Sequence, residues 1–112
     1  MIMTDRFVNG NESNDGNLNG AASGADWQGG DFAGVTSMIE SGYFADLGVN
    51  ALWLTPFNAA AQGTGKAADG VHDVSAFHGY WPTEARGVEP RLGTEGELHA
   101  MIDAAHESVA FA

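Results

Sequence analysis

A short apolar run closed by a proline places the strongest constraint on what this chain can fold into. Residues 49–54 read Val-Asn-Ala-Leu-Trp-Leu, after Gly48 and before Thr55-Pro56. A run of this length predicts a buried strand rather than a helix. Gly48 is expected to end a preceding helix, and the strand is expected to end at Pro56 because proline has no N–H to donate.

Helical patterns lie on both sides of this run. Before it, apolar residues recur at helical spacing over Phe32–Leu47, with a break at Ser41-Gly42 and Asp31 as the expected N-cap. After it, Thr94 and Glu97 form a capping box that opens a one-faced helix over Glu95–Glu107. The order helix, buried strand, long loop, helix predicts a parallel α/β fold.

Composition and charge exclude several classes of protein. The chain has 112 residues and no cysteine, which suits one small domain or part of a larger one and excludes disulfides and thiolate metal sites. No apolar run approaches the ~20 residues of a membrane-spanning helix, and the N-terminus lacks the features of a signal peptide. The net charge of −11 argues against nucleic acid and anionic membranes as partners. The acidity fits a soluble surface, and calcium binding would account for only some of the carboxylates.

A polar loop is expected between residues 9 and 30. Asn9-Gly10-Asn11-Glu12-Ser13-Asn14-Asp15 is followed by Gly16–Gly30, which is rich in Gly, Asn, Ala and Ser and predicts no core. The cluster is either a turn-rich loop or a set of oxygen ligands for a hard cation. An EF-hand is excluded: if Asn9 is counted as the first position of that motif, Asn14 stands where it needs glycine and Gly20 where it needs glutamate.

A second long loop is expected over Phe57–Gly93, and it carries a cluster of rings. Phe77, His78, Tyr80 and Trp81 lie within five residues of one another. They form either a small satellite core under the loop or a stacking surface for a flat apolar face, such as a sugar ring or a base. In the second interpretation His78 adds a hydrogen bond to the ligand.

Four blocks, taken together and in order, resemble the α-amylase family of glycoside hydrolases. They are residues 5–15, Gly29-Gly30-Asp31, residues 48–56, and His78-Gly79-Tyr80-Trp81-Pro82-Thr83. Pro90-Arg91-Leu92-Gly93-Thr94, leading into a helix with Asp103-Ala104-Ala105-His106, fits as well. The resemblance covers nearly the whole chain, and bacterial α-amylases, cyclomaltodextrinases and cyclodextrin glucanotransferases share these blocks.

The resemblance implies a (β/α)₈ TIM barrel, of which this chain is the opening portion, from strand one to helix two. Such barrels need about 250 residues, so residues 1–112 are expected to be the N-terminal part of the catalytic barrel, with a long loop at 57–93. The implied elements, in order, are the tail of strand one (Met1–Phe7), helix one (Phe32–Leu47), strand two (Val49–Leu54), helix two (Glu95–Glu107) and the edge of strand three (Val109–Ala112).

The family's activity is hydrolysis or transfer of α-linked glucans, such as starch, maltodextrin or cyclodextrin, with retention. The aspartate nucleophile, glutamic acid/base and third aspartate follow strands four, five and seven in the family. No catalytic residue is therefore assigned in this chain, and the chain alone is expected to be inactive. The alternative is a non-catalytic carbohydrate- or calcium-binding module. An extracellular or periplasmic location is expected from the family.

The resemblance also implies two sites. His78, Tyr80 and Trp81 would line the sugar pocket. A structural calcium ion would be held by Asn9, Asn11, Asn14, Asp15, Gly29 and Asp31. Two features depart from the family: Glu84-Ala85-Arg86-Gly87 stands where an aspartate with aromatic residues is usual, and Glu107–Ala112 lacks the usual basic-Gly turn and long apolar strand. The second departure indicates a truncated or frame-shifted reading frame, or a gene fragment.

Overall fold

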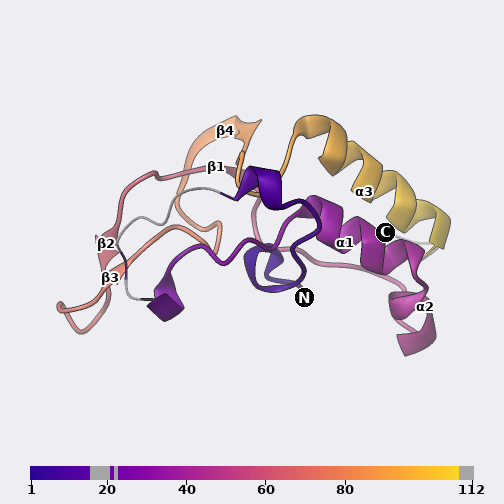
Figure 1. Ribbon diagram of the computed structural model, residues 1–112, viewed down its shortest axis with the longest axis horizontal. Helices are drawn as coiled ribbons and strands as arrows, with labels where there is room; N and C mark the ends of the chain where they lie inside the picture. The colour runs from indigo at the N-terminus through magenta and orange to yellow at the C-terminus, as the bar shows by residue number, and fades with distance from the viewer. Residues whose placement is uncertain (16–20, 22, 109–112) are drawn as a thin grey trace.

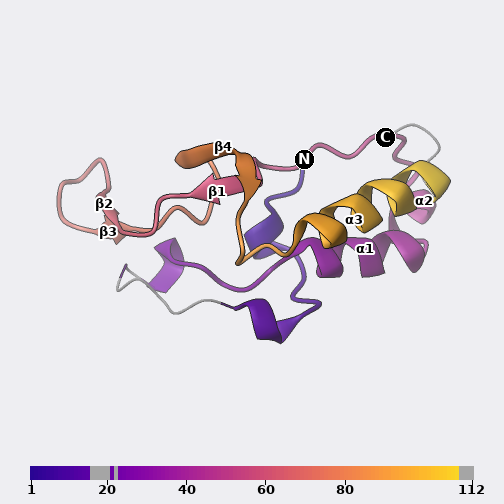
Figure 2. The ribbon, with the colours of Figure 1, turned by 90° about the horizontal axis from the view of Figure 1, so that it is seen from above.

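The computed structural model describes residues 1–15, 21 and 23–108, and Figure 1 shows their arrangement. The elements in chain order are η1 (Thr4–Arg6), η2 (Glu12–Asn14), η3 (Ser23–Ala25), α1 (Phe32–Glu40), α2 (Tyr43–Leu47), β1 (Asn58–Ala60), β2 (Gly65–Lys66), β3 (Asp73–Val74), β4 (Pro82–Val88) and α3 (Glu95–Ser108). The three α-helices gather at one end and the β2–β3 pair forms the other, with α1 and α3 side by side in both Figure 1 and Figure 2. The predicted edge of strand three, 109–112, lies outside the described residues.

The two segments expected as strands one and two, residues 1–7 and 49–54, are hydrogen-bonded to each other at a single point. The N–H of Ile2 donates to the carbonyl of Trp53 at 2.7 Å, and the N–H of Thr55 donates to the carbonyl of Ile2 at 2.9 Å. These bonds form one parallel bridge between Ile2 and Leu54. The prediction of a strand over 49–54, and of a strand tail over 1–7, is therefore wrong beyond this bridge, because a ladder needs a backbone partner at each step and only Ile2 supplies one among the described residues.

Burial along 49–54 also differs from the prediction. Leu52 and Leu54 are half-buried and pack against the core, whereas Trp53 is 70% exposed and Val49 is exposed as well. Successive side chains of an extended segment point to opposite faces. One face of this segment therefore lies on the helices, and the face that carries Trp53 is largely exposed.

The expected helix over 32–47 is two helices. The carboxylate of Asp31 accepts the N–H of Gly34 at 2.8 Å, which confirms this residue as the N-cap of α1. Helix α1 ends at Glu40, and α2 follows Gly42, whose φ is 86°. Gly48 then ends α2 with φ 79°, as the sequence predicted.

The last helix agrees closely with its prediction. The hydroxyl of Thr94 accepts the N–H of Glu97 at 3.1 Å, and the Glu97 carboxylate accepts the N–H of Thr94 at 2.9 Å. This reciprocal pair is the capping box. Helix α3 runs from Glu95 to Ser108, and it buries one face through Leu98, Met101 and Ala105. Among the described residues, no helix is long and apolar enough to cross a membrane.

The segment predicted as one long loop, 57–93, contains all four strands of the described part of the chain. Strand β1 pairs with β4 and β2 pairs with β3, each time antiparallel. These strands are short, and most of β4 is exposed, so they lack the apolar alternation by which a sequence indicates a strand. The segment Glu84–Gly87, which departs from the family, lies within β4, where the carbonyl of Ala85 accepts the side-chain amide of Asn58 at 2.6 Å.

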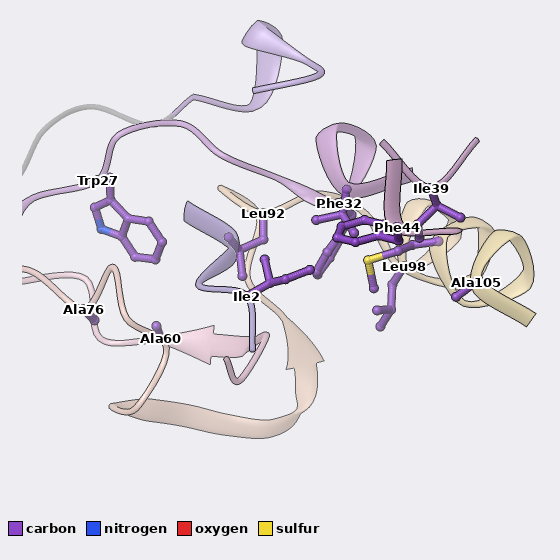
Figure 3. Packing of buried hydrophobic residues seen from close by; sticks show 12 residues of the cluster. Ile2, Trp27, Phe32, Ile39, Phe44, Ala60, Ala76, Leu92, Leu98 and Ala105 are labelled. Carbon is purple, nitrogen blue, oxygen red and sulfur yellow. The ribbon is translucent and has the colours of Figure 1, made fainter. Parts of the chain in front are cut away.

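The hydrophobic core is elongated, as Figure 3 shows. Phe32 and Ile39 of α1 pack with Leu98 of α3 near the helical end, and Trp27 lies at the opposite end of the same cluster. Trp27 is buried, so the prediction that Gly16–Gly30 contributes no core is wrong. Its ring lies under the guanidinium of Arg91 at 4.9 Å, a partner distant in sequence that composition does not reveal.

Candidate functional site

The rings that stood out in the sequence lie together just before β4; we call residues 77–81 the aromatic segment. A turn at Gly79 shapes it: the N–H of Gly79 donates to the carbonyl of Ala76 at 3.0 Å, and φ at Gly79 is 83°. A Cβ at this position would stand 2.1 Å from the carbonyl oxygen of Pro56. Glycine is therefore required both by the left-handed backbone and by the close approach of the segment that follows residues 49–54.

The aromatic segment has a buried half and an exposed half. Phe77 packs against the core and meets the His78 ring at a centroid distance of 5.3 Å. His78 lies edge-to-face with Trp81 at 4.7 Å, while Tyr80 is 55% exposed and Trp81 38%. The satellite-core interpretation thus describes Phe77, while Tyr80 and Trp81 are exposed enough to remain available to a ligand.

The hydrogen bonds of His78 determine which nitrogen is available to a ligand. Its Nδ1 accepts the backbone N–H of Tyr80 at 2.9 Å. Neutral imidazole carries one proton, so that proton stands on Nε2, which can donate to a ligand oxygen. Burial lowers the pKa of His78 below its ordinary value, which favours this neutral form. The segment therefore offers partly exposed aromatic rings beside one directed donor, a combination suited to a sugar.

A buried carboxylate lies behind this surface. Asp5 accepts the N–H groups of Gln28 and Gly29 at 3.0 and 3.1 Å and pairs with the guanidinium of Arg6. Burial raises the pKa of Asp5, and the two N–H groups and the Arg6 charge oppose that rise. Asp5 therefore ties the N-terminal segment to the backbone of residues 28 and 29.

A second buried carboxylate, Glu89, connects β1 to the loop before α3. It accepts the N–H of Ala60 and the N–H of Arg91, each at 3.0 Å, and the Arg91 guanidinium lies 3.6 Å from it. Glu89 is 1% exposed. Its role is structural, and the sequence analysis missed it because nothing in a Glu-Pro-Arg tripeptide indicates burial.

Three of the six residues proposed as calcium ligands converge. The side-chain amide of Asn9 donates to the carboxylate of Asp15 at 2.8 Å. A Cβ added at Gly29 would stand 2.6 Å from the Asn9 amide and 3.1 Å from an Asp15 oxygen. Gly29 therefore allows the backbone to approach both side chains, which brings the two ends of the polar loop to one place.

The other three residues lie in different environments. Both amide atoms of Asn14 are buried without a hydrogen-bond partner, which a ligand would relieve. The side-chain oxygen of Asn11 accepts from Ser13. Asp31 is fully buried, and beyond capping α1 it accepts the N–H groups of Gly10 and Asn11 at 2.9 and 3.1 Å.

The donor set fits calcium by its chemistry. It contains two carboxylates, three amides and a backbone carbonyl, which are oxygen ligands of the kind that calcium prefers. Within the described residues, no group of three or more His, Cys, Asp or Glu side chains could hold a metal. The described residues therefore contain no metal site built from three such side chains. The proposed calcium site differs, because amide and backbone carbonyl oxygens supply most of its ligands.

The family assignment follows from comparison of the whole chain. The family model described as "Alpha amylase, catalytic domain" matches residues 1–109. The chain therefore belongs to the α-amylase family of glycoside hydrolases.

Named relatives agree with this assignment. The chain is 34% identical over 111 residues to the periplasmic alpha-amylase of Escherichia coli (strain K12), with 95% of this chain and 16% of the relative covered. It is 36% identical over 112 residues to the cyclomaltodextrin glucanotransferase of Paenibacillus macerans, with 94% and 15% covered.

Solved structures give the same result for the fold. The gamma-CGTase from Alkalophilic bacillus clarkii superposes with a TM-score of 0.81 at 30% identity, over 96% of this chain and 16% of that one. The alpha-amylase from Geobacillus thermoleovorans complexed with acarbose superposes with a TM-score of 0.70 at 32% identity, over 95% of this chain and 19% of that one. These neighbours are TIM-barrel proteins of the family. The chain spans about a sixth of the length of the curated relatives it matches.

Proposed function

We propose that residues 1–112 form the N-terminal part of a catalytic barrel, from strand one to helix two, in an enzyme that acts on α-linked glucans with retention. The parallel bridge between Ile2 and Leu54, with α1 packed beside α3, supports this arrangement. Successive β/α units of a parallel barrel pair their strands and lay their helices on the same outer face. The uncovered side of Trp53 would then face the rest of the barrel.

The aromatic segment is the observation that carries the functional proposal. In the enzyme Tyr80 would stack on a sugar ring, Nε2–H of His78 would donate to a hydroxyl, and Trp81 would support the wall of the pocket. One solved neighbour is a complex with acarbose and another a complex with maltose. The substrate of this chain's enzyme would be of that kind, an α-glucan oligosaccharide or polysaccharide.

The chemistry itself would be supplied from outside these residues. The family's nucleophile, acid/base and third aspartate follow later strands, so none of the fifteen carboxylates here is assigned to catalysis. A non-catalytic carbohydrate- or calcium-binding module built from the same loops is the alternative. The sequence of the surrounding locus separates the two, because continuation into strands three to eight with three acids supports the enzyme. A location outside the cytoplasm accords with the periplasmic relative.

A structural calcium ion belongs to the same proposal. Asn9, Asn14 and Asp15 would offer side-chain oxygens and Gly29 its carbonyl, and Asn11 and Asp31 would complete the set. The unpartnered amide of Asn14 and the convergence of Asn9, Asp15 and Gly29 support it. Bound there, the ion would tie the polar loop to the start of α1 and would stabilise the fold by mass action.

The experiment that tests the glucan site is a tyrosine substitution in the complete enzyme. Tyr80→Ala is expected to lose about 2–4 kcal/mol of transition-state stabilisation, measured as kcat/KM on maltoheptaose. Tyr43→Ala is the matched control, since Tyr43 is a partly exposed tyrosine of α2. An unchanged kcat/KM for Tyr80→Ala would leave Tyr80 with a structural role only.

A further inference from the structure

Arg6 connects three segments that are distant in the sequence, and one of them is the aromatic segment. Its guanidinium lies 3.8 Å from the centroid of the Phe77 ring. We propose that Arg6 is a positioning residue, which holds His78 and Trp81 in the orientation that binds an α-glucan. The inference rests on the proposed function for its ligand, and its contacts stand independently of that function.

A series of ring contacts connects Arg6 to the exposed part of the aromatic segment. Phe77 lies directly under the guanidinium and meets His78 edge-to-face at 5.3 Å. His78 in turn meets Trp81 at 4.7 Å with an interplanar angle of 89°. Each contact is a short, geometrically specific aromatic interaction. Movement of the Phe77 ring therefore displaces the imidazole donor and the indole wall together.

A short strap, residues 24–26, holds Arg6 in place on its other side. Arg6 donates to the carbonyls of Gly24 and Asp26 at 2.9 and 2.8 Å. The carbonyl between them, that of Ala25, accepts the N–H of Ser75 at 2.9 Å. The strap thus offers three consecutive carbonyls, of which two bind Arg6 and the middle one binds the chain two residues before Phe77.

The chemistry of the guanidinium explains why arginine suits this position. Its planar fork donates to two carbonyls while its face lies on a ring, whereas a lysine ammonium is a compact charge that cannot do both with the same geometry. Asp5, buried beside it, neutralises the charge. The side chain is 27% exposed, so most of the contact with Phe77 is removed from water, where a cation–π interaction is stronger.

The test uses the polypeptide at its full encoded length and three variants. Arg6→Met keeps the aliphatic stem and removes the charge and donors, and Arg6→Lys restores the charge alone. Arg86→Met is the matched control, because Arg86 is an exposed arginine of β4. Affinity for maltoheptaose is measured by tryptophan fluorescence well below the melting temperature of each variant. NMR records the Cε1–H signal of His78 and the indole N–H of Trp81, with the His99 ring on α3 as an internal reference.

The expected result separates positioning from a merely structural role. Arg6→Met should raise the Kd for maltoheptaose at least about tenfold, since displacement by roughly an ångström is costly at a binding site. It should also shift the His78 and Trp81 signals while the His99 signal stays. Arg6→Lys keeps the cation over the Phe77 ring but lacks the planar fork, so it should recover only part of the lost affinity. Arg86→Met should change neither readout.

Two results would overturn the inference. One is a lower melting temperature for Arg6→Met with an unchanged Kd, and the other is unshifted His78 and Trp81 signals in that variant. If the wild-type protein does not bind maltoheptaose, the proposed function fails, and the NMR signals still decide the role of Arg6. If Arg6→Met does not fold, Phe77→Leu breaks the same relay while leaving the strap bonds, and unmoved signals in that variant overturn the inference.

Discussion

The backbone N–H of Tyr80 donates to Nδ1 of His78 at 2.9 Å, so one residue of the aromatic segment sets the tautomer of another. Protonated imidazole carries a proton on both nitrogens. Charging His78 therefore breaks this bond as well as placing a cation in a partly buried site. Both effects oppose protonation, in agreement with the pKa of His78, which burial lowers.

The first prediction concerns pH. Above the ordinary histidine pKa of about 6.5, the ring is neutral in folded and unfolded chains alike, so the lowered folded-state pKa does not change the free energy of unfolding there. As the pH falls through the lowered folded-state value, the stability that the neutral ring contributes is lost. Maltoheptaose affinity should be constant at pH values where His78 is neutral and should weaken as the folded chain's His78 becomes protonated. Fluorescence titration across the pH range measures it. His78→Gln is the control, and an identical pH dependence in that variant would contradict the prediction.

The second prediction concerns the turn at Gly79. Gly79→Ala should destabilise the fold by about 2–4 kcal/mol, because it combines left-handed strain with a clash against the Pro56 carbonyl. Gly70→Ala is the matched control: φ there is 70°, and a Cβ would meet nothing within 4 Å. It should lose only about 1–2 kcal/mol, from the backbone conformation alone. Urea denaturation measures both, and equal losses would show that the contact with Pro56 is unimportant.

Local signals in the sequence predicted the helical end of the molecule well. The cap at Asp31, the box of Thr94 and Glu97, and the break before Gly42 depend on residues within four positions of one another. The strands were predicted poorly, because pairing is a long-range property. Nothing in the run 49–54 reveals that a single residue, Ile2, supplies its backbone partner.

In the candidate site, too, the local features were predictable from the sequence and the long-range contacts were not. Its exposed members are adjacent in the chain, so His78, Tyr80 and Trp81 were identified from the sequence as a cluster. The contact between Arg6 and Phe77 that supports them was not predicted, because these two residues are far apart in the sequence and meet only in the folded chain. An Asp-Arg pair near an N-terminus looks like surface charge, and its burial against an aromatic ring is a property of the fold.

The third prediction concerns activity. The 112-residue chain alone should show no glycosidase turnover, because a retaining mechanism needs two carboxyl groups about 5–5.5 Å apart across the scissile bond. Asp5, which pairs with Arg6 behind the aromatic segment, is buried and bound to two backbone N–H groups. The assay is release of nitrophenol from a chromogenic maltoside, with a mock purification from the same host as control. Turnover that copurifies with the chain and is absent from the mock preparation would contradict the prediction.

The fourth prediction concerns calcium, and the structure indicates which substitution is informative. Asp31→Ala removes the cap of α1 and leaves the N–H groups of Gly10 and Asn11 unpaired. That variant should lose about 1 kcal/mol or more whether or not calcium is present. The Asp15 carboxylate accepts the exposed side-chain amide of Asn9, so Asp15→Ala should leave the metal-free stability nearly unchanged and abolish the response to calcium.

The measurement is a thermal melt of the full-length enzyme in EDTA, in excess calcium and in excess magnesium. Calcium at about a hundred times its Kd should stabilise the wild type by about 2.7 kcal/mol. Magnesium should substitute poorly, because a site assembled from separate loop segments does not enforce tight octahedral geometry. Glu12→Ala is the matched control, an exposed acid of the same loop outside the proposed ligand set, and it should keep the full response. A wild-type melting temperature that does not move with calcium would leave the cluster as a turn-rich loop, and loss of the response in Glu12→Ala would assign the effect to general loop charge.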